Sequence, residues 1–211
     1  MGLTQEHYEL YTFLTDCVYS ELAYPSQIGF NERVVKTSGL RLEIFELIDR
    51  KIIIICGTNS LKDWLTNIKV GLGFTPHQHK QALKIVKREI EECKENGKFL
   101  IICGHSLGGG IAEYCLANIG ETEFNNYYGI TYNGCGVKHL KGQLNEGKIL
   151  NITTSKDILN GITTRLPFRN YLQHYGRLNI IKDTTTWNPI KSHCNFEVMM
   201  KYQVNTNSGK E

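Results

Sequence analysis

The amino-acid sequence predicts an α/β fold with a mostly parallel central sheet flanked by helices. Three observations indicate this fold: short apolar runs with the length of buried strands, longer segments with apolar residues at helical spacing, and the alternation of the two along the chain. In sheets of this kind, functional side chains gather beyond the carboxyl ends of the strands. Residues that directly follow a predicted strand are therefore the candidates for a functional site.

The first half of the chain predicts a helix, a β-hairpin and a second helix. Apolar and aromatic residues from Tyr8 to Leu22 recur at helical spacing, and Pro25 marks the end of this pattern. Between the two predicted hairpin strands, Asp49–Lys51 forms a polar turn, and the second strand is apolar throughout, as expected of a strand buried on both faces. The predicted elements are a helix over 8–24, strands over 40–47 and 52–56, and a helix over 77–96 that ends at Gly97.

The second half continues the alternation of strands and helices. Residues 99–103 are all apolar or Cys and predict another buried strand. The segment 107–119 has helical character despite its early glycines, which permit close approach to neighbouring backbone. The remaining predictions are strands over 129–133, 149–154 and 178–181 and a last helix over 192–204.

Length and composition fit one globular domain and exclude several classes of protein. A chain of 211 residues has the length of a single domain, and 41% apolar with 21% charged residues is typical of a folded one. The 24 basic and 21 acidic side chains leave a net charge of +3, too small to indicate a nucleic-acid-binding surface. We expect a single domain over residues 1–204, followed by a polar, flexible tail over 205–211.

No segment of the sequence predicts a membrane span or a secretion signal. The longest aliphatic run, Ile52–Ile55, is far shorter than the roughly 20 residues that cross a bilayer. Residues 1–6 lack the basic stretch and apolar core of a signal peptide, so we expect a cytoplasmic protein, with another export route and a viral origin as open alternatives. The 7 cysteines are odd in number and never spaced as Cys-x-x-Cys, which favours buried thiols over disulfides or a zinc site.

One motif indicates nucleophilic chemistry. Gly104-His105-Ser106-Leu107-Gly108 matches Gly-x-Ser-x-Gly and stands between a predicted strand and a predicted helix, which is the context that a serine nucleophile elbow requires. Small residues at 104 and 108 allow the sharp turn, and the amino end of the following helix favours a developing negative charge. Ser106 is therefore the candidate nucleophile.

A serine nucleophile needs a histidine base, which in turn needs a carboxylate to orient it. In α/β-hydrolases the acid follows the serine in the chain and precedes the histidine. Asp157 comes just after the strand predicted at 149–154 and is the preferred acid, with Asp183 as an alternative. His193 follows the last predicted strand and is the preferred base, with His174 as an alternative.

A second motif connects the sequence to a known family. After the buried strand Ile52–Cys56 comes Gly57-Thr58, then a loop with Asp63-Trp64 and an Asn three residues after the Trp. Together with Gly104–Gly109, this order of motifs resembles the class 3 lipases, whose fold is the α/β-hydrolase fold. The resemblance extends over about residues 8–200 and includes the segments Ser155–Ile158, Leu166–Pro167 and Tyr171–Gly176. The family's usual Arg before Gly-Thr is replaced by Cys56.

The resemblance implies a serine carboxylic-ester hydrolase that acts on lipids through an acyl-enzyme. It would be a lipase or esterase similar to triacylglycerol lipases, with a phospholipase as an open alternative. It implies a catalytic triad of Ser106, His193 and Asp157 and a lipid ester as substrate. It also implies an oxyanion hole formed by the backbone N–H groups of Thr58 and Leu107. No cofactor and no metal is expected.

The segment after Thr58 carries an apolar stripe. Leu61, Trp64, Leu65 and Ile68 stand at positions i, i+3, i+4 and i+7, so they lie on one face of a short helix. This stripe either packs permanently against the body of the domain or belongs to a lid, as its place in class 3 lipases implies. A lid would add transient contact with a lipid interface to the expected partners.

Other functions remain open at this level. An acyltransferase would use the same triad but deliver the acyl group to an alcohol, and a catalytically silent ligand-binding module could keep the same fold. A nucleotide-binding P-loop is disfavoured, because Gly142–Lys148 is followed by Ile149 in place of the required Ser or Thr and by a predicted strand in place of a helix.

Overall fold

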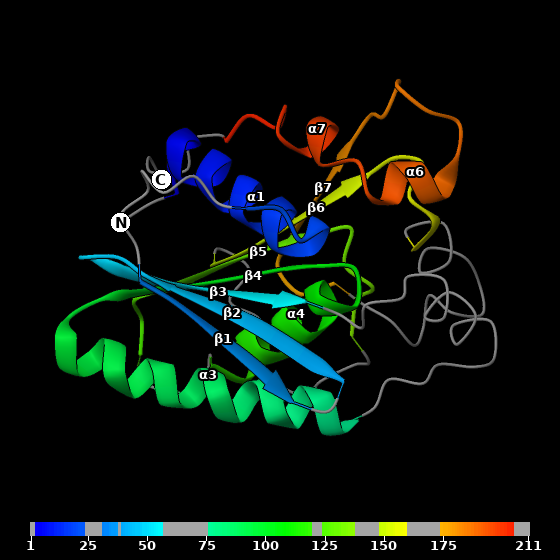
Figure 1. Ribbon diagram of the computed structural model, residues 1–211. Helices are drawn as coiled ribbons and strands as arrows, with labels where there is room; N and C mark the ends of the chain where they lie inside the picture. The colour runs from blue at the N-terminus through cyan, green and yellow to red at the C-terminus, as the bar shows by residue number, and fades with distance from the viewer. Residues whose placement is uncertain are drawn as a thin grey trace.

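The computed structural model of the chain describes residues 3–23, 31–37, 39–56, 76–119, 124–137, 148–159 and 174–204. It shows the α/β architecture that the sequence predicts, with a seven-stranded sheet flanked by helices (Figure 1). The strands are β1 (Asn31–Thr37), β2 (Leu40–Glu46), β3 (Arg50–Cys56), β4 (Phe99–His105), β5 (Tyr127–Tyr132), β6 (Ile149–Thr154) and β7 (Arg177–Ile181). The helices are α1 (Gln5–Ser20), α3 (Pro76–Asn96), α4 (Leu107–Ile119), α6 (Pro189–His193) and α7 (Phe196–Met199).

The spatial order of the strands follows the chain from β1 to β7. The first three strands pair antiparallel, whereas β3 to β7 pair parallel throughout. Parallel neighbours require a crossover connection, and α3 and α4 lie on the crossovers from β3 to β4 and from β4 to β5. The carboxyl ends of β4, β5 and β6 consequently meet at one edge of the sheet, which is where the candidate site lies.

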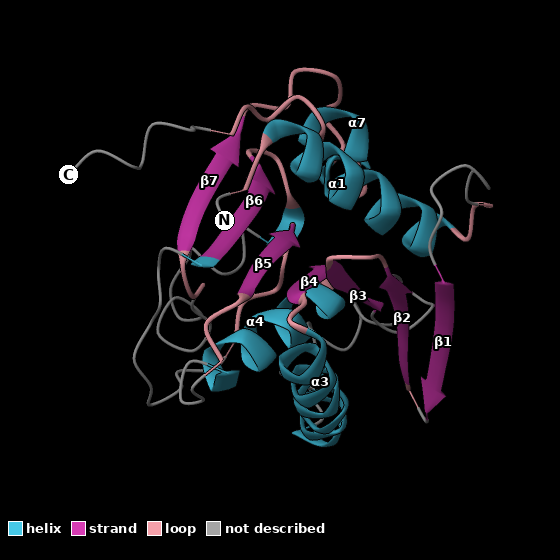
Figure 2. Ribbon diagram, turned by 90° about the vertical axis from the view of Figure 1, so that its left-hand side faces the viewer, coloured by secondary structure: helices cyan, strands magenta, loops and turns pink. Residues whose placement is uncertain are grey.

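The helices form two layers, one on each face of the sheet. Figure 2 shows α3 and α4 on one face and α1 with α7 on the other. A hydrophobic core lies on each face of the sheet, and alternate residues of the central strands point into one or the other. Ile53 and Ile55 pack with α3 and α4, whereas Ile52 and Ile54 pack with α1 and α7. Burial on both faces explains why β3 is a continuous apolar run rather than an alternating one.

Several boundaries differ from the predicted ones. The opening helix ends at Ser20 rather than near residue 24, because Glu21 adopts a left-handed conformation and closes the helix with its backbone N–H. The hairpin turn precedes Arg50, so β3 begins two residues earlier than predicted. β1 was not predicted at all, since this edge strand is largely exposed on both faces and carries no apolar alternation.

The prediction of one continuous last helix over 192–204 is wrong. The segment forms two short helices, and His193 ends α6 instead of opening a longer helix. Asn188 caps the amino end of α6, and the side chain of Asn195 accepts a hydrogen bond from the Val198 N–H and starts α7. Two Asn caps within eight residues favour two helix starts over one continuous helix.

Candidate active site

Ser106 occupies a sharp turn between β4 and α4. Its φ angle is +58°, a left-handed backbone conformation that is uncommon for any residue except glycine. The turn is held by a hydrogen bond from the Ser106 N–H to the carbonyl of Tyr132 (3.1 Å), at the end of β5. The Ser106 carbonyl accepts bonds from the N–H groups of Gly110 and Cys135, each at 3.2 Å. Backbone strain of this kind, fixed by surrounding bonds, is typical of functional sites.

The glycine before the elbow serine is required by close packing. A Cβ atom at Gly104 would lie 2.4 Å from the carbonyl oxygen of Gly108, a distance that real Cβ atoms do not reach. Strand β4 can therefore approach the first turn of α4 only with glycine at this position. This is the physical reason for the first Gly of the motif.

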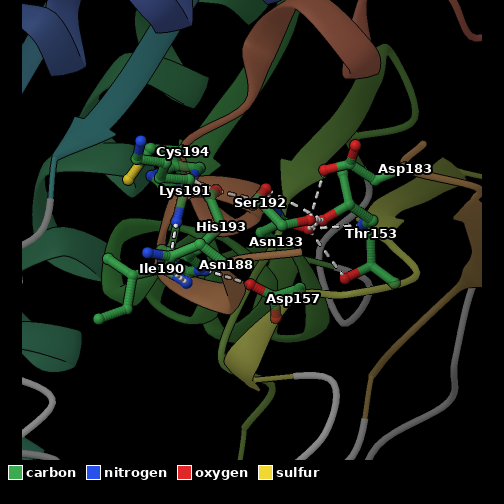
Figure 3. A network of polar contacts seen from close by, with 12 residues as sticks. Asn133, Thr153, Asp157, Asp183, Asn188, Ile190, Lys191, Ser192, His193 and Cys194 are labelled. Carbon is green, nitrogen blue, oxygen red and sulfur yellow. Dashed lines mark hydrogen bonds and ion pairs between the residues drawn. The ribbon is translucent and has the colours of Figure 1, made fainter. Parts of the chain in front are cut away.

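The structure brings the predicted acid and base into direct contact. Asp157 lies three residues beyond the end of β6, and His193 is the last residue of α6. Both side chains are completely buried, and Oδ1 of Asp157 pairs with Nδ1 of His193 (Figure 3). A carboxylate at Nδ1 orients an imidazole ring so that Nε2 is left to act as the base.

The other ring nitrogen of His193 has no hydrogen-bond partner among the described residues. Nε2 is buried and makes no hydrogen bond to any described residue, Ser106 included. Buried polar atoms are nearly always hydrogen-bonded, and the exceptions concentrate at catalytic groups. Hydrogen bonds between a nucleophile and its base are often long without substrate and tighten when substrate binds.

His105, the residue before the candidate nucleophile, contacts the candidate base. The two imidazole rings lie 4.7 Å apart between centroids, and Nε2 of His105 donates a hydrogen bond of 2.7 Å to the carbonyl of His193. Burial, and to a lesser extent the neighbouring imidazole of His193, hold the pKa of His105 well below its usual value, which favours the neutral form of His105. The motif that carries Ser106 is thus attached directly to the helix that carries His193.

Asn133, at the end of β5, links the segments that carry the acid and the base. Its Nδ2 donates to the carbonyls of His193 (2.7 Å) and Ser192 (3.3 Å). Its Oδ1 accepts from the N–H of Thr154 (2.7 Å) and the hydroxyl of Thr153 (3.1 Å), at the end of β6 (Figure 3). One buried amide therefore fixes the base segment relative to the strand that precedes the acid.

Replacing Asn133 with glycine is expected to lower kcat by about 10- to 100-fold with little change in KM, because the Asp157–His193 pair loses its alignment. Asn133 has a φ of +44°, which glycine adopts without strain, so the variant removes the amide while the backbone is preserved. The matched control is Tyr8→Phe, which removes a buried hydrogen bond from α1 to the Met199 carbonyl (2.7 Å). Equal loss of kcat in both variants would contradict a positioning role.

Asp183, the alternative acid, is bound elsewhere. Its carboxylate accepts hydrogen bonds from the hydroxyls of Ser192 (2.7 Å) and Thr185 (2.8 Å) and from the Thr185 N–H (2.8 Å). Burial opposes the charge of Asp183, but these bonds and one from Asn195 prevail and lower its pKa to about 2. Asp183 thus anchors the base segment through the side chain of Ser192 (Figure 3). Within the described residues it forms no hydrogen bond or ion pair with His174 or His193.

His174, the alternative base, pairs with a different carboxylate. Its Nδ1 lies 2.8 Å from Oε1 of Glu113, a buried residue of α4 whose Oε2 accepts the N–H of Tyr175 at 3.2 Å. Burial disfavours the charged form of His174, but the charge of Glu113 and the hydrogen bond to it outweigh burial and raise the pKa of His174. This pair fastens the chain before β7 to α4.

The His174 pair predicts a pH-dependent contribution to stability. Because the folded pKa is raised, the stabilisation is complete below the unfolded pKa of about 6.5 and is lost as pH rises through the folded pKa. His174→Gln imitates the neutral imidazole, so the difference in unfolding free energy from the natural protein should be about 1 to 2 kcal/mol at pH 5.5 and fall toward zero at pH 9. Urea unfolding across this range measures it, and a difference that does not vary with pH would refute the charged pair.

Some predicted site residues lie outside the described part of the chain. These are Thr58 of the expected oxyanion hole and the apolar stripe Leu61, Trp64, Leu65 and Ile68. Leu107 is described and is the first residue of α4. The first N–H groups of a helix have no acceptor within the helix, and the N–H of Leu107 is one of them. Sequence reasoning missed the roles of Asn133 and His105. Asn133 matches no recognised motif, and His105 occupies a position of the Gly-x-Ser-x-Gly motif that any residue can fill.

Within the described ranges, the chain contains no cluster of three or more potential metal ligands. No helix in those ranges combines the length and apolar character needed to cross a membrane.

Comparison with known proteins identifies similar chains. Residues 21–141 match a family described as Phospholipase-like, Tle-like phospholipase domain. The extracellular phospholipase A1 of Serratia liquefaciens is 28% identical over 152 residues, which are 72% of this chain and 43% of that protein. The chain thus corresponds to less than half the length of this relative.

Solved structures show the same fold. Lipase II from Rhizopus niveus superposes with a TM-score of 0.64 at 15% identity, covering 86% of this chain and 82% of that one. The N225Q mutant of MDLA from Penicillium cyclopium superposes with a TM-score of 0.60 at 14% identity, covering 84% of this chain and 80% of that one. Both similarities concern the architecture of the sheet and its helices.

Proposed function

The chain belongs to the Tle-like phospholipase domain family, which has a lipase-like α/β-hydrolase fold, and from this premise we propose that it hydrolyses carboxylic esters of phospholipids. The observation that carries the proposal is the buried contact between Asp157 and His193 beside the strained serine turn. The phospholipase A1 of Serratia liquefaciens supports a phospholipid as the substrate.

The proposed reaction proceeds in two steps through an acyl-enzyme. The hydroxyl of Ser106 attacks the ester carbonyl while Nε2 of His193 takes its proton and then returns it to the leaving alcohol. A water molecule, deprotonated by the same nitrogen, next attacks the acyl-serine and releases the fatty acid. Asp157 holds the ring in the required tautomer and stabilises the imidazolium that forms in each step.

The negative charge of the tetrahedral intermediate needs donors that are oriented in advance. The N–H of Leu107, at the amino end of α4, is the proposed first donor, and the helix dipole adds to its effect. The N–H of Thr58 is the proposed second donor, by analogy with class 3 lipases. Loss of one donor of this type typically costs about 100- to 1,000-fold in rate.

The test is product analysis with phospholipids that carry a different acyl chain at each of the two ester positions. Hydrolysis predicts release of free fatty acid and lysophospholipid, and the identity of the acid reveals which ester is cleaved. Triacylglycerol and soluble p-nitrophenyl esters are assayed in parallel, with a long-chain alcohol added as a competing acceptor. Transfer of the acyl group to the alcohol in preference to water would contradict hydrolysis, and absence of turnover on every ester would contradict the enzyme assignment.

A further inference from the structure

Two large apolar side chains are exposed on the segment that leads to the candidate base. Trp187 is 89% exposed and Ile190 is 47% exposed, three to six residues before His193. Tryptophan is among the largest apolar side chains and is strongly buried on average in folded proteins. The two exposed apolar side chains stand three residues apart, in one short stretch of the chain.

The exposed charged side chains of the segment 174–195 are all basic. Lys182 and Lys191 are exposed, and Nζ of Lys156 lies 4.0 Å from the centre of the Trp187 ring and donates to the Thr186 carbonyl at 2.8 Å. Within residues 174–195 the only carboxylate is Asp183, which is 1% exposed and turned toward Ser192. The exposed charge of this part of the described chain is therefore entirely positive.

This surface lies at the same end of the sheet as the candidate active site. Trp187 stands in the connection between β7 and α6, and Ile190 belongs to α6, the short helix that ends at His193. Figure 1 shows this connection and α6 beyond the carboxyl ends of the parallel strands, on the side where β6 ends. A membrane bound here would therefore lie at the end of the sheet that carries Ser106.

We propose that Trp187, Ile190, Lys156, Lys182 and Lys191, called here the Trp187 surface, dock the protein on membranes that contain anionic phospholipids. Tryptophan prefers the boundary between lipid headgroups and acyl chains, where its ring is apolar and its N–H can bond to a polar group. Lysines beside it attract anionic headgroups, each with about a fivefold gain in binding. The charge complementarity favours an anionic bilayer over a neutral one. The purpose of docking, which is to bring the enzyme to its lipid substrate, rests on the proposed function, whereas the docking itself does not.

The test measures binding of the full chain to lipid vesicles in the Ser106→Ala background, so that hydrolysis does not alter the membrane. Sedimentation with vesicles of phosphatidylcholine alone, and of phosphatidylcholine with phosphatidylglycerol, should show strong preference for the anionic vesicles. Trp187→Ala should weaken binding to the anionic vesicles by at least about tenfold, and Lys191→Gln by about fivefold. Trp187→Phe should keep much of the affinity, since a smaller aromatic ring remains.

The chain offers a matched control on the opposite edge of the sheet. Ile48 is 97% exposed in the turn between β2 and β3, at the end away from Ser106. Ile48→Ser removes a comparably exposed apolar side chain and should leave vesicle binding unchanged. If Ile48→Ser and Trp187→Ala weaken binding equally, or if Trp187→Ala binds as the parent does, the docking surface is refuted.

A second measurement separates this inference from the proposed function. Trp187→Ala with Ser106 intact should hydrolyse a soluble p-nitrophenyl ester at the natural rate while hydrolysis of anionic vesicles falls about tenfold. Equal loss on both substrates would indicate damage to the catalytic site and would overturn the docking role. Absence of esterase activity in the natural protein would contradict the proposed function, while vesicle binding would still decide the role of this surface. Preference for neutral vesicles, or no vesicle binding, would overturn the proposed membrane docking.

Discussion

Replacing Ser106 with alanine is expected to lower kcat for ester hydrolysis by about 10⁵- to 10⁶-fold, because no described neighbour can replace the nucleophile. A thiol near the turn, Cys135, is buried beside Gly110 and donates to the Gly136 carbonyl at 3.3 Å. Burial also raises the pKa of this thiol far above its usual value, so it is not a thiolate at neutral pH. The measurement is single-turnover hydrolysis of a p-nitrophenyl ester.

The fold of the Ser106→Ala variant should be preserved. Alanine occupies less space than serine, and a φ of +58° costs alanine about as much conformational free energy as it costs serine. The midpoint temperature of unfolding of the variant should therefore stay within a few degrees of that of the natural protein. A serine-directed phosphonate should label the natural protein once per chain and leave the variant unlabelled. Residual activity above about 1% in the variant would show that another residue is the nucleophile.

Replacing Asp157 with asparagine is expected to lower kcat by about 10⁴-fold. The amide can donate to Nδ1 of His193 and would then stabilise the tautomer with the proton on Nε2, which cannot accept a proton from serine. The effect should fall on kcat more than on KM, since neither residue binds the lipid directly in the proposed mechanism. Steady-state kinetics on a soluble ester at pH 7 to 9 measures both constants.

Asp183→Asn is the matched control for this prediction. It makes the same chemical change in the other buried aspartate of the region, whose partners are hydroxyl and amide donors of Ser192 and Thr185. The variant should be less stable than the natural protein but lose much less activity than Asp157→Asn when both are folded. If the two asparagine variants lose activity to the same degree, the acid has been assigned wrongly.

Most of the fold was predictable from the sequence because its strands and helices carry strong local patterns. The apolar run of β3 and the helix that follows Ser106 were predicted close to their observed bounds. The edge strand β1 was missed because its exposed, polar residues resemble a loop. The division of the last helix was missed because Asn195, which caps α7, does not interrupt the apolar spacing.

The sequence by itself determined the α/β architecture and the chemical type of the candidate residues. Hydrophobic spacing and the glycines around Ser106 are properties of neighbouring residues, so they can be read along the chain. Position after a predicted strand also singled out Asp157 and His193, with Asp183 as an alternative acid, and His174 stayed an alternative base.

Only the tertiary structure decided which carboxylate faces which histidine. Asp157 contacts His193 at a sequence separation of 36 residues, and Glu113 pairs with His174 at a separation of 61. Asn133 donates a hydrogen bond to His193 at a separation of 60. Such pairings depend on how β5, β6 and the crossing segments pack against one another, and local patterns carry no information about distances between segments so far apart. The same holds for the Trp187 surface, because the exposure of a side chain is a property of the folded chain as a whole.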